Sequence, residues 1–254
     1  MSAWTFTDDG PLRILTLDHG DLNLYDAEVE EGLFDAIHAL TADPPRAVLI
    51  RAEGKVWTGG VEVERFAGIS AEQGAVLWKR QFDLMHELED LPCPVIFASH
   101  GLTLTWGLEL ALACDMVVAA RDARFGLPEV TIGLVPTCGA LFRGPRALPH
   151  NVARELVLTG DPIPATRAHE LGLVNRLAEP GEALAGAVEL AERVCRNAAV
   201  AVRECLAATP RAIGSDDEGW AATDHAAAAI RASDDAAEGV RAFLEKRPPV
   251  WTGR

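Results

Sequence analysis

Hydrophobic and polar positions in the first quarter of the chain follow two periods, one typical of strands and one typical of helices. The runs AWTFTDD and LRILTLDH are strand-like and meet at DGP, which predicts a β-hairpin. Val29, Leu33, Ile37 and Leu40 then recur on one helical face between residue 26 and about 41. The short apolar run RAVLIRAEG follows, so we expect a hairpin, a helix and a third strand, in this order.

The middle of the chain continues the alternation of helices and apolar strands. Residues 70 to 91 have helical spacing, with Ser70 as the expected N-cap, and Pro92 and Pro94 end the helix. PVIFASHG and DMVVAARD are the next buried strands, and the gap of about 14 residues between them leaves room for a short crossover helix. Alternating strands and helices predict an α/β fold with a mainly parallel sheet.

The C-terminal third has the pattern of a helical region. From about residue 139 onward, GLVNRLA is the single segment that we expect to form a strand. EALAGAVELAERVCRNAAVAVRECLAAT has the spacing of one long amphipathic helix, and DEGWAATDHAAAAIRAS and SDDAAEGVRAFLEKR have the spacing of two more. Both of these last segments carry acidic residues near their starts, where the helix dipole favours them.

Composition and charge exclude several classes of protein. The 254 residues carry a net charge of −15, which argues against a nucleic-acid surface because phosphates need Lys and Arg partners. The start MSAWTFTDDG lacks the features of a signal peptide, and Glu109 and Asp115 interrupt the longest apolar run, so we expect no membrane span. Five scattered cysteines without a CxxC motif predict neither a disulfide framework nor a metal site, and they favour the cytoplasm.

Glu109 is the most unusual residue of the apolar run GLTLTWGLELALACDMVVAA, residues 101 to 120. If residues 106 to 113 form a helix, no face of it is polar, so Glu109 is either buried or faces a cavity. A buried carboxylate without a partner usually becomes neutral through a raised pKa. An ion pair with an arginine, or a favourable place in the helix dipole, is the alternative that needs no active site.

Three loops follow strands of the expected sheet at its carboxyl edge, where parallel sheets bind ligands. They are KVWTGGVEV at residues 55 to 63, LTLTWGLEL, and LPEVTIGLVPTCG with Glu129. Backbone N–H groups in such loops can bind an oxygen that gains negative charge, and paired carboxylates can move protons to and from carbon or water. Taken alone, the glycines would make ordinary turns, and Glu129 would be a solvated loop residue.

Four motifs, taken in order, carry a resemblance to one known family. WTGGVEV is similar to F-S-A-G-A-D-L, and HGLTLTWGLELALACDMVVAARDARFGLPEVTIGLVP is similar to a stretch from N-G-x-A-x-G-G-G-x-E-L-x-x-x-C-D to P-E-x-x-x-G-x-x-P. ARELVLTGDPIPATRAHELGLVNRL and EGVRAFLEKRPP are similar to later segments of the same family, the enoyl-CoA hydratase/isomerase (crotonase) superfamily. The resemblance implies a crotonase-like spiral of ββα units in residues 1–195, a helical C-terminal trimerisation region in residues 196–254, and a homotrimer or hexamer.

The resemblance implies an enzyme that adds water across the double bond of a 2-enoyl-CoA thioester. The backbone N–H groups of Val61 and Trp106 would form the oxyanion hole for the thioester oxygen, and Glu109 and Glu129 would be the acid/base pair. One carboxylate would activate the water while the other relays a proton. Family members that only isomerise a double bond often keep only the acid at position 129, so the presence of both acids favours a hydratase.

The resemblance also implies that coenzyme A binds as part of the acyl-CoA substrate and not as a separate cofactor. Backbone groups near Leu22 and Leu24 would hold the adenine, and Lys246 with Arg247 would bind the phosphates from a neighbouring subunit. Lys246 and Arg247 could instead form a solvated basic helix end. The remaining positions expected at the substrate are Thr58, Gly60, Glu62, Val63, Gly107, Pro128 and Thr137.

The chain departs from the family pattern at the site itself. Trp106 replaces the second glycine of G-G-G, Val61 replaces a usual Ala, and Thr137 replaces a usual Gly. The backbone donor survives such a change, because every residue except proline keeps its N–H. We expect the Trp106 ring to form a wall of the acyl pocket. Double-bond isomerisation, other acyl-CoA thioester chemistry and non-catalytic acyl-CoA binding stay open as alternatives.

Overall fold

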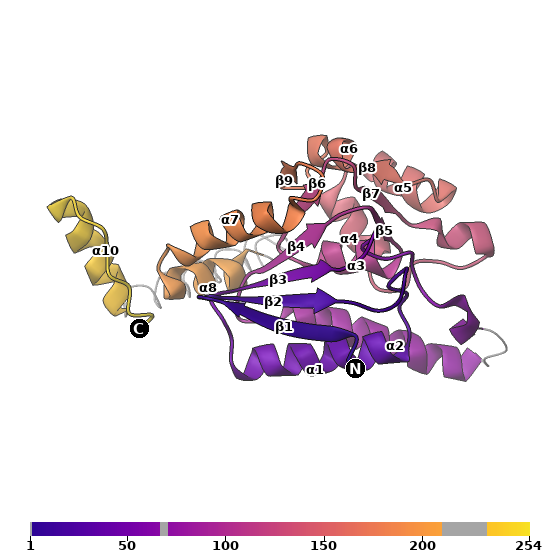
Figure 1. Ribbon diagram of the computed structural model, residues 1–254, viewed down its shortest axis with the longest axis horizontal. Helices are drawn as coiled ribbons and strands as arrows, with labels where there is room; N and C mark the ends of the chain where they lie inside the picture. The colour runs from indigo at the N-terminus through magenta and orange to yellow at the C-terminus, as the bar shows by residue number, and fades with distance from the viewer. Residues whose placement is uncertain (1, 67–70, 210–232) are drawn as a thin grey trace.

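Two β-sheets organise the protein, of which the computed structural model describes residues 2–66, 71–209 and 233–254 (Figure 1). The larger sheet has the order β1-β2-β3-β4-β6-β9, and every neighbouring pair except β1 and β2 is parallel. The predicted hairpin and the mainly parallel sheet are therefore confirmed. The strands of this sheet are β1 (Trp4–Asp9), β2 (Leu12–Leu17), β3 (Ala47–Ala52), β4 (Val95–Ser99), β6 (Met116–Ala120) and β9 (Arg176–Ala178).

Helices cover both faces of the larger sheet, which explains why its central strands are mostly apolar. Alternate residues of β3 enter different cores: Val48 and Ile50 pack in the larger one with α1, and Leu49 packs in the smaller one with α7. Figure 1 shows α1 and α2 on one side of the sheet and α7 on the other. The predicted N-cap Ser70 lies outside the described residues. The covering helices are α1 (Ala27–Ala42), α2 (Ala71–Glu89) and α7 (Ala183–Cys195).

The second sheet consists of three short strands in the order β5-β7-β8. A bridge between Thr58 and Thr103 joins the loop after β3 to its edge. Successive turns of the chain thus add a strand to the large sheet, a segment to the small sheet and then a helix, which is the expected spiral of ββα units. The prediction of a single strand after residue 139 is wrong, because β8 has two residues, too few to show a period. The strands are β5 (Leu102–Leu104), β7 (Arg124–Gly126) and β8 (Ile163–Pro164).

The predicted crossover helix is α3 (Trp106–Ala113), which is buried along nearly its whole length and packs against α2 and α4. In the part of the chain that the structure describes, no helix combines the length and apolarity that crossing a membrane requires. The short helices near α3 are η1 (Val63–Phe66), η2 (Pro128–Ile132), α4 (Ala140–Ala147), α5 (His150–Thr159) and α6 (Ala165–Glu170).

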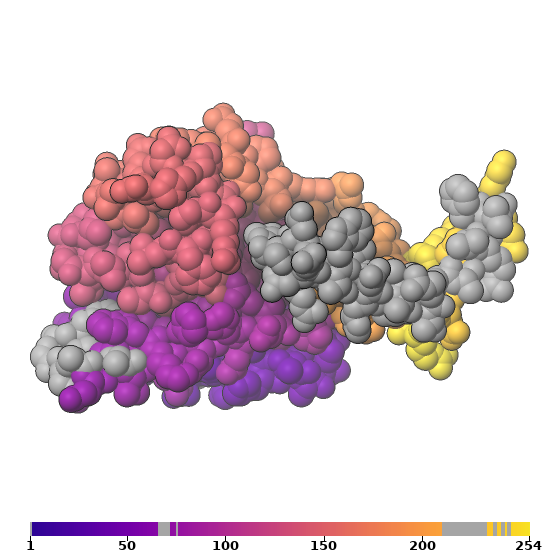
Figure 2. Space-filling model, turned by 180° about the vertical axis from the view of Figure 1, so that it is seen from behind, coloured from indigo at the N-terminus to yellow at the C-terminus, as the bar shows by residue number. Residues whose placement is uncertain are grey.

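The C-terminal region is helical, but the long helix predicted there is wrong, since two helices, α7 and α8 (Ala199–Ala208), take its place. Between them the chain is extended at Ala198. Arg46 stabilises the end of α7, because its guanidinium donates to the carbonyls of Cys195 and Asn197 at 3.2 and 2.6 Å. The helix predicted over residues 217–233 falls almost wholly outside the described residues. The last predicted helix forms as α10 (Asp234–Glu245), beyond α8 at one end of the molecule (Figure 1, Figure 2).

Candidate active site

The start of α3 carries a large part of the expected site. Thr105, with a positive φ of 50°, turns the chain from β5 into the helix. The N–H of Trp106 lies in the first helical turn, where the helix itself offers no acceptor. Gly107 has to be glycine, because a Cβ at this position would come within 2.4 Å of the Thr58 methyl group.

The loop after β3 supplies the second candidate backbone donor. The carbonyl of Gly60 accepts the N–H of Tyr25 at 2.9 Å, which ties this loop to the segment before α1. Among the hydrogen bonds of the described residues, none uses the N–H of Val61. Val61 and Trp106 line the same cavity, so the residues that carry both candidate donors lie at a single site.

The indole of Trp106 faces the protein interior. Its Nε1 donates to the carbonyl of Gly60 and to the hydroxyl of Thr58, both at 3.0 Å. The ring packs against Tyr25 and Trp57, with centroids 4.9 and 5.4 Å away, and Trp106 is only 1% exposed. The side chain therefore links α3 to the loop after β3. That the ring also limits the acyl group stays a prediction.

Glu109 and Glu129 reach the cavity from α3 and η2, and both residues are buried. Glu109 Oε1 accepts the N–H of Ala140 at 3.0 Å, whereas Glu129 Oε2 is sealed from solvent without a hydrogen-bond partner. Burial raises the pKa of each carboxyl group to about 7, and the negative charge of Glu109 contributes to the raised pKa of Glu129. Near neutral pH, each carboxyl group is therefore protonated in part of the molecules.

One cavity of about 200 Å³ joins these groups. The sequence analysis did not predict Gln81 as a site residue. Gln81 lies on the same face of α2 as Leu84 and Leu88, and a polar residue on this apolar face could have indicated a place at the site. The predicted site residues that line the cavity are Val61, Trp106, Glu109, Glu129 and Thr137. The lining residues that were not predicted are Trp78, Gln81, Gly133, Leu134, Val135 and Cys138.

A buried arginine fixes the turn that donates to Glu109. Arg143 is 5% exposed, and its guanidinium donates hydrogen bonds to both carboxylate oxygens of Glu89 at 2.6 and 2.5 Å. The same guanidinium donates to the carbonyl of Cys138 at 2.8 Å. Ala140, which supplies the N–H to Glu109, lies two residues further along this turn. The position of Glu109 is thus connected to α2 through Arg143.

Several other predicted residues are not part of the cavity lining. Thr58 is fully buried, and its hydroxyl donates to the carbonyl of Asn23 at 2.6 Å, so it serves its own loop. Leu22 and Val63 are 50% and 51% exposed, and the carbonyl of Leu22 accepts the N–H of the loop residue Gly59. Leu24 lies in the segment before α1, and Gly60 and Glu62 lie in the loop after β3 that contacts it. Gly107 is part of α3, and Pro128 begins η2.

Lys246 is the predicted residue that the single chain does not bring to this cavity. It directly follows α10, which lies apart from α3 and α4 (Figure 1). Arg247 is paired with Glu238 and Glu245 at 2.7 and 2.6 Å. A role for Lys246 at coenzyme A therefore requires a second subunit and stays a prediction.

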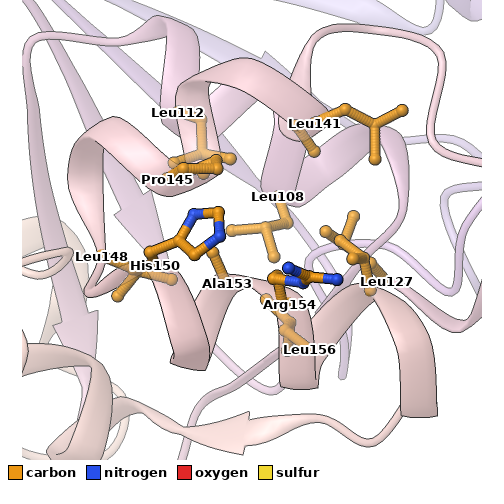
Figure 3. A pocket seen from close by; sticks show the side chains of 13 residues that line it. Leu108, Leu112, Leu127, Leu141, Pro145, Leu148, His150, Ala153, Arg154 and Leu156 are labelled. Carbon is orange, nitrogen blue, oxygen red and sulfur yellow. The ribbon is translucent and has the colours of Figure 1, made fainter.

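A second cavity, of about 220 Å³, lies between α3, α4 and α5. Leucines form much of its wall, and His150 and Arg154 extend from α5 among them (Figure 3). Its lining includes no carboxylate and none of the predicted site residues. The cavity with Glu109 and Glu129 is the candidate active site, because it brings together both predicted acids and the residues of both candidate backbone donors.

Comparisons with known proteins identify the family. The family model for enoyl-CoA hydratase/isomerase matches residues 12–254. An enoyl-CoA hydratase structure from Mycobacterium tuberculosis H37Rv is 36% identical, with a TM-score of 0.87 over 100% of both chains. An enoyl-CoA hydratase structure from Bacillus anthracis is 29% identical, with a TM-score of 0.94 over 99% of this chain and 100% of its own. A carnitinyl-CoA dehydratase from Salmonella typhi is 34% identical over 98% of this chain and 97% of its own length.

The chain therefore belongs to the enoyl-CoA hydratase/isomerase family, and its spiral is the crotonase fold, as the four motifs implied. It is an enzyme of the hydratase–lyase type, in a family that acts on acyl-CoA substrates. A thioester carbonyl gains negative charge on its oxygen during such reactions, and backbone N–H groups can stabilise such a charge.

Proposed function

We propose that the protein adds water to a 2-enoyl-CoA, with Glu109 and Glu129 as the acid/base pair. The observation that carries this proposal is the meeting of two buried carboxyl groups of raised pKa with two backbone donors in one cavity. Hydration needs both parts, because it requires a base for water, an acid for carbon and a site for the enolate oxygen.

The N–H groups of Val61 and Trp106 would bind the thioester oxygen. Their donation draws electron density from Cβ and stabilises the enolate that forms when the water oxygen bonds to that carbon. Such donors act strongly where water is excluded, and losing one raises an activation barrier by about 3 kcal/mol.

The hydrogen bonds of the two carboxyl groups suggest which is base and which is acid. Glu109 accepts the N–H of Ala140, which favours its ionised form, so Glu109 would take the proton from water. Glu129 keeps an unpartnered buried oxygen, which favours its neutral form, so Glu129 would give its proton to Cα. The electron pair on the enolate oxygen returns to form the Cα–H bond. A proton transfer from Glu109 to Glu129 then restores the starting state.

Coenzyme A would lie along residues 22–24 and 58–63. These two segments are joined by backbone hydrogen bonds, and Leu22 and Val63 expose apolar surface beside them. Lys246 of a neighbouring subunit, in a homotrimer or hexamer, would bind the phosphates in this arrangement. We further propose that the enzyme acts in the cytoplasm.

The test is the loss of enoyl-thioester absorbance with purified enzyme and 2-enoyl-CoA substrates of several chain lengths. Glu109→Gln and Glu129→Gln should each lower kcat by about 10²- to 10⁴-fold, while the exposed Glu28→Gln leaves it unchanged. Absence of turnover with every 2-enoyl-CoA would overturn the proposal. An isomerase would instead tolerate Glu109→Gln far better than Glu129→Gln and would move the double bond.

Dehydration of a 3-hydroxyacyl-CoA is the same reaction in reverse and would use the same groups. The relative named carnitinyl-CoA dehydratase makes this direction worth measuring with the same variants. A non-catalytic acyl-CoA-binding protein would give heat on binding in calorimetry without turnover of any thioester.

A further inference from the structure

A buried amide lies in the part of the cavity contributed by α2. Gln81 is 2% exposed, and its Oε1 lies 3.3 Å from the hydroxyl of Thr137 and 3.7 Å from the thiol of Cys138. The hydroxyl and the thiol both contact the amide at Oε1, so the amide Nε2 points away from them.

The Nε2 of Gln81 is a hydrogen-bond donor without a partner among the described residues. Nε2 is unpartnered within the described part of the chain but is not sealed from solvent. Oε2 of Glu129 differs, because it is both unpartnered and sealed. Since Gln81 lines the cavity that holds both acids, its N–H₂ group is accessible to a molecule bound there. An amide on an otherwise apolar helix face is costly to keep unless something accepts its hydrogen bonds.

We propose that the acyl group of the natural substrate carries an oxygen that accepts a hydrogen bond from Gln81. This inference rests on the proposed hydratase function and names the substrate class: a 2-enoyl-CoA with a neutral oxygen function beyond Cβ, such as a hydroxyl, ketone or amide. The cavity of about 200 Å³ would hold this oxygen together with the reacting carbons and the water.

The charges around the cavity favour a neutral oxygen group on the acyl chain of the substrate. A carboxylate on the acyl chain would approach Glu109 and Glu129 and meet like charge. A quaternary ammonium group has no lone pair for the N–H₂ of Gln81 and would leave that donor unpaired. A plain alkyl chain would bury the donor as well, so it should bind and react less well.

The experiment compares two substrates of nearly equal size, pent-2-enoyl-CoA and 4-hydroxybut-2-enoyl-CoA, in which a methyl group is exchanged for a hydroxyl. Wild-type enzyme should prefer the hydroxylated substrate by at least tenfold in kcat/KM. Gln81→Met, which keeps the length of the side chain but removes the amide, should abolish or reverse this preference. Because the ratio is taken within one variant, general damage to the fold cancels.

Binding of the saturated analogues pentanoyl-CoA and 4-hydroxybutanoyl-CoA, measured by calorimetry, gives a readout that needs no turnover. The same preference, and its loss in Gln81→Met, is expected. A wild-type preference for the alkyl compounds, or an unchanged ratio in Gln81→Met, would overturn the proposal while leaving hydratase activity intact. Failure to hydrate any 2-enoyl-CoA would instead count against the proposed function, and the binding ratio would still decide the role of Gln81.

Discussion

Trp106 and Gly60 are joined by a hydrogen bond of 3.0 Å from the indole Nε1 to the carbonyl oxygen. The backbone N–H groups of Trp106 and Val61 are the two candidate oxyanion donors. Because Gly60 directly precedes Val61, this bond connects the Trp106 side chain to the loop that carries the second donor. A glycine at position 106 has no side chain with which to make this bond. Trp106 thus fixes the spacing between the start of α3 and the loop after β3, whereas a glycine would leave this spacing flexible.

Trp106→Phe should lower kcat/KM about 10- to 100-fold, mainly through kcat, because the ring stays packed but Gly60 and Thr58 lose their shared donor. Steady-state kinetics on one good 2-enoyl-CoA substrate measures the effect. Trp251→Phe is the matched control, since its Nε1 donates to the carbonyl of Arg196, which does not line the cavity. Wild-type kinetics in Trp106→Phe would show that the indole bond does not position the donors.

The rate should depend on pH with a maximum near 7. In the proposed mechanism Glu109 has to be ionised and Glu129 protonated, and burial raises the pKa of each to about 7. Below this range both groups carry a proton, and above it both are ionised, so kcat/KM should fall on both sides. Glu109→Gln should keep only the fall at high pH in its residual activity. A flat profile between pH 5 and 9 would contradict the assignment of Glu109 as base and Glu129 as acid.

Glu129→Gln should make the protein more stable at pH 8 but not at pH 5. The Glu129 carboxyl group has a pKa of about 7 in the folded chain and an ordinary value of 4.5. Its protonated form is therefore favoured by folding, and this stability is lost as pH rises from 4.5 through 7. The neutral amide avoids that loss, so the free energy of unfolding at pH 8 should rise by about 1–3 kcal/mol.

Urea denaturation at pH 5 and pH 8 checks this difference, with Glu28→Gln as an exposed control. Equal stability of wild type and Glu129→Gln at both pH values would mean that folding does not raise the pKa of Glu129. Loss of stability at pH 8 would show that its charge is satisfied by a partner.

The sequence predicted the features that depend on neighbouring residues. The apolar face with Val29 and Leu33 gave α1, and the fully apolar helix around Glu109 indicated a buried carboxyl group. The resemblance brought Val61, Trp106, Glu109 and Glu129 into one site, but periodicity carries no information on which distant side chains bond to one another. Trp106 bonds to a residue 46 positions away, and Thr137 to Gln81 56 positions away. The direction of the Trp106 indole toward the interior and the place of the Gln81 amide at the cavity therefore emerged only from the fold.

Arg143 should prove to be a positioning residue for Glu109. Arg143→Lys keeps the charge but cannot grip both oxygens of Glu89 and also reach the carbonyl of Cys138, so the turn before Ala140 should loosen. We expect kcat to fall about tenfold or more with little change in KM, since the lost geometry matters to the reacting acid more than to binding.

The acid limb of the pH profile distinguishes this role from a purely structural one. Glu109 would lose part of the hydrogen bonding that favours its ionised form, so the acid limb should move to higher pH in Arg143→Lys. Arg146→Lys, on the same helix and exposed, should leave the profile unchanged. An unaltered acid limb in a folded Arg143→Lys enzyme would restrict Arg143 to stabilising α4 against α2.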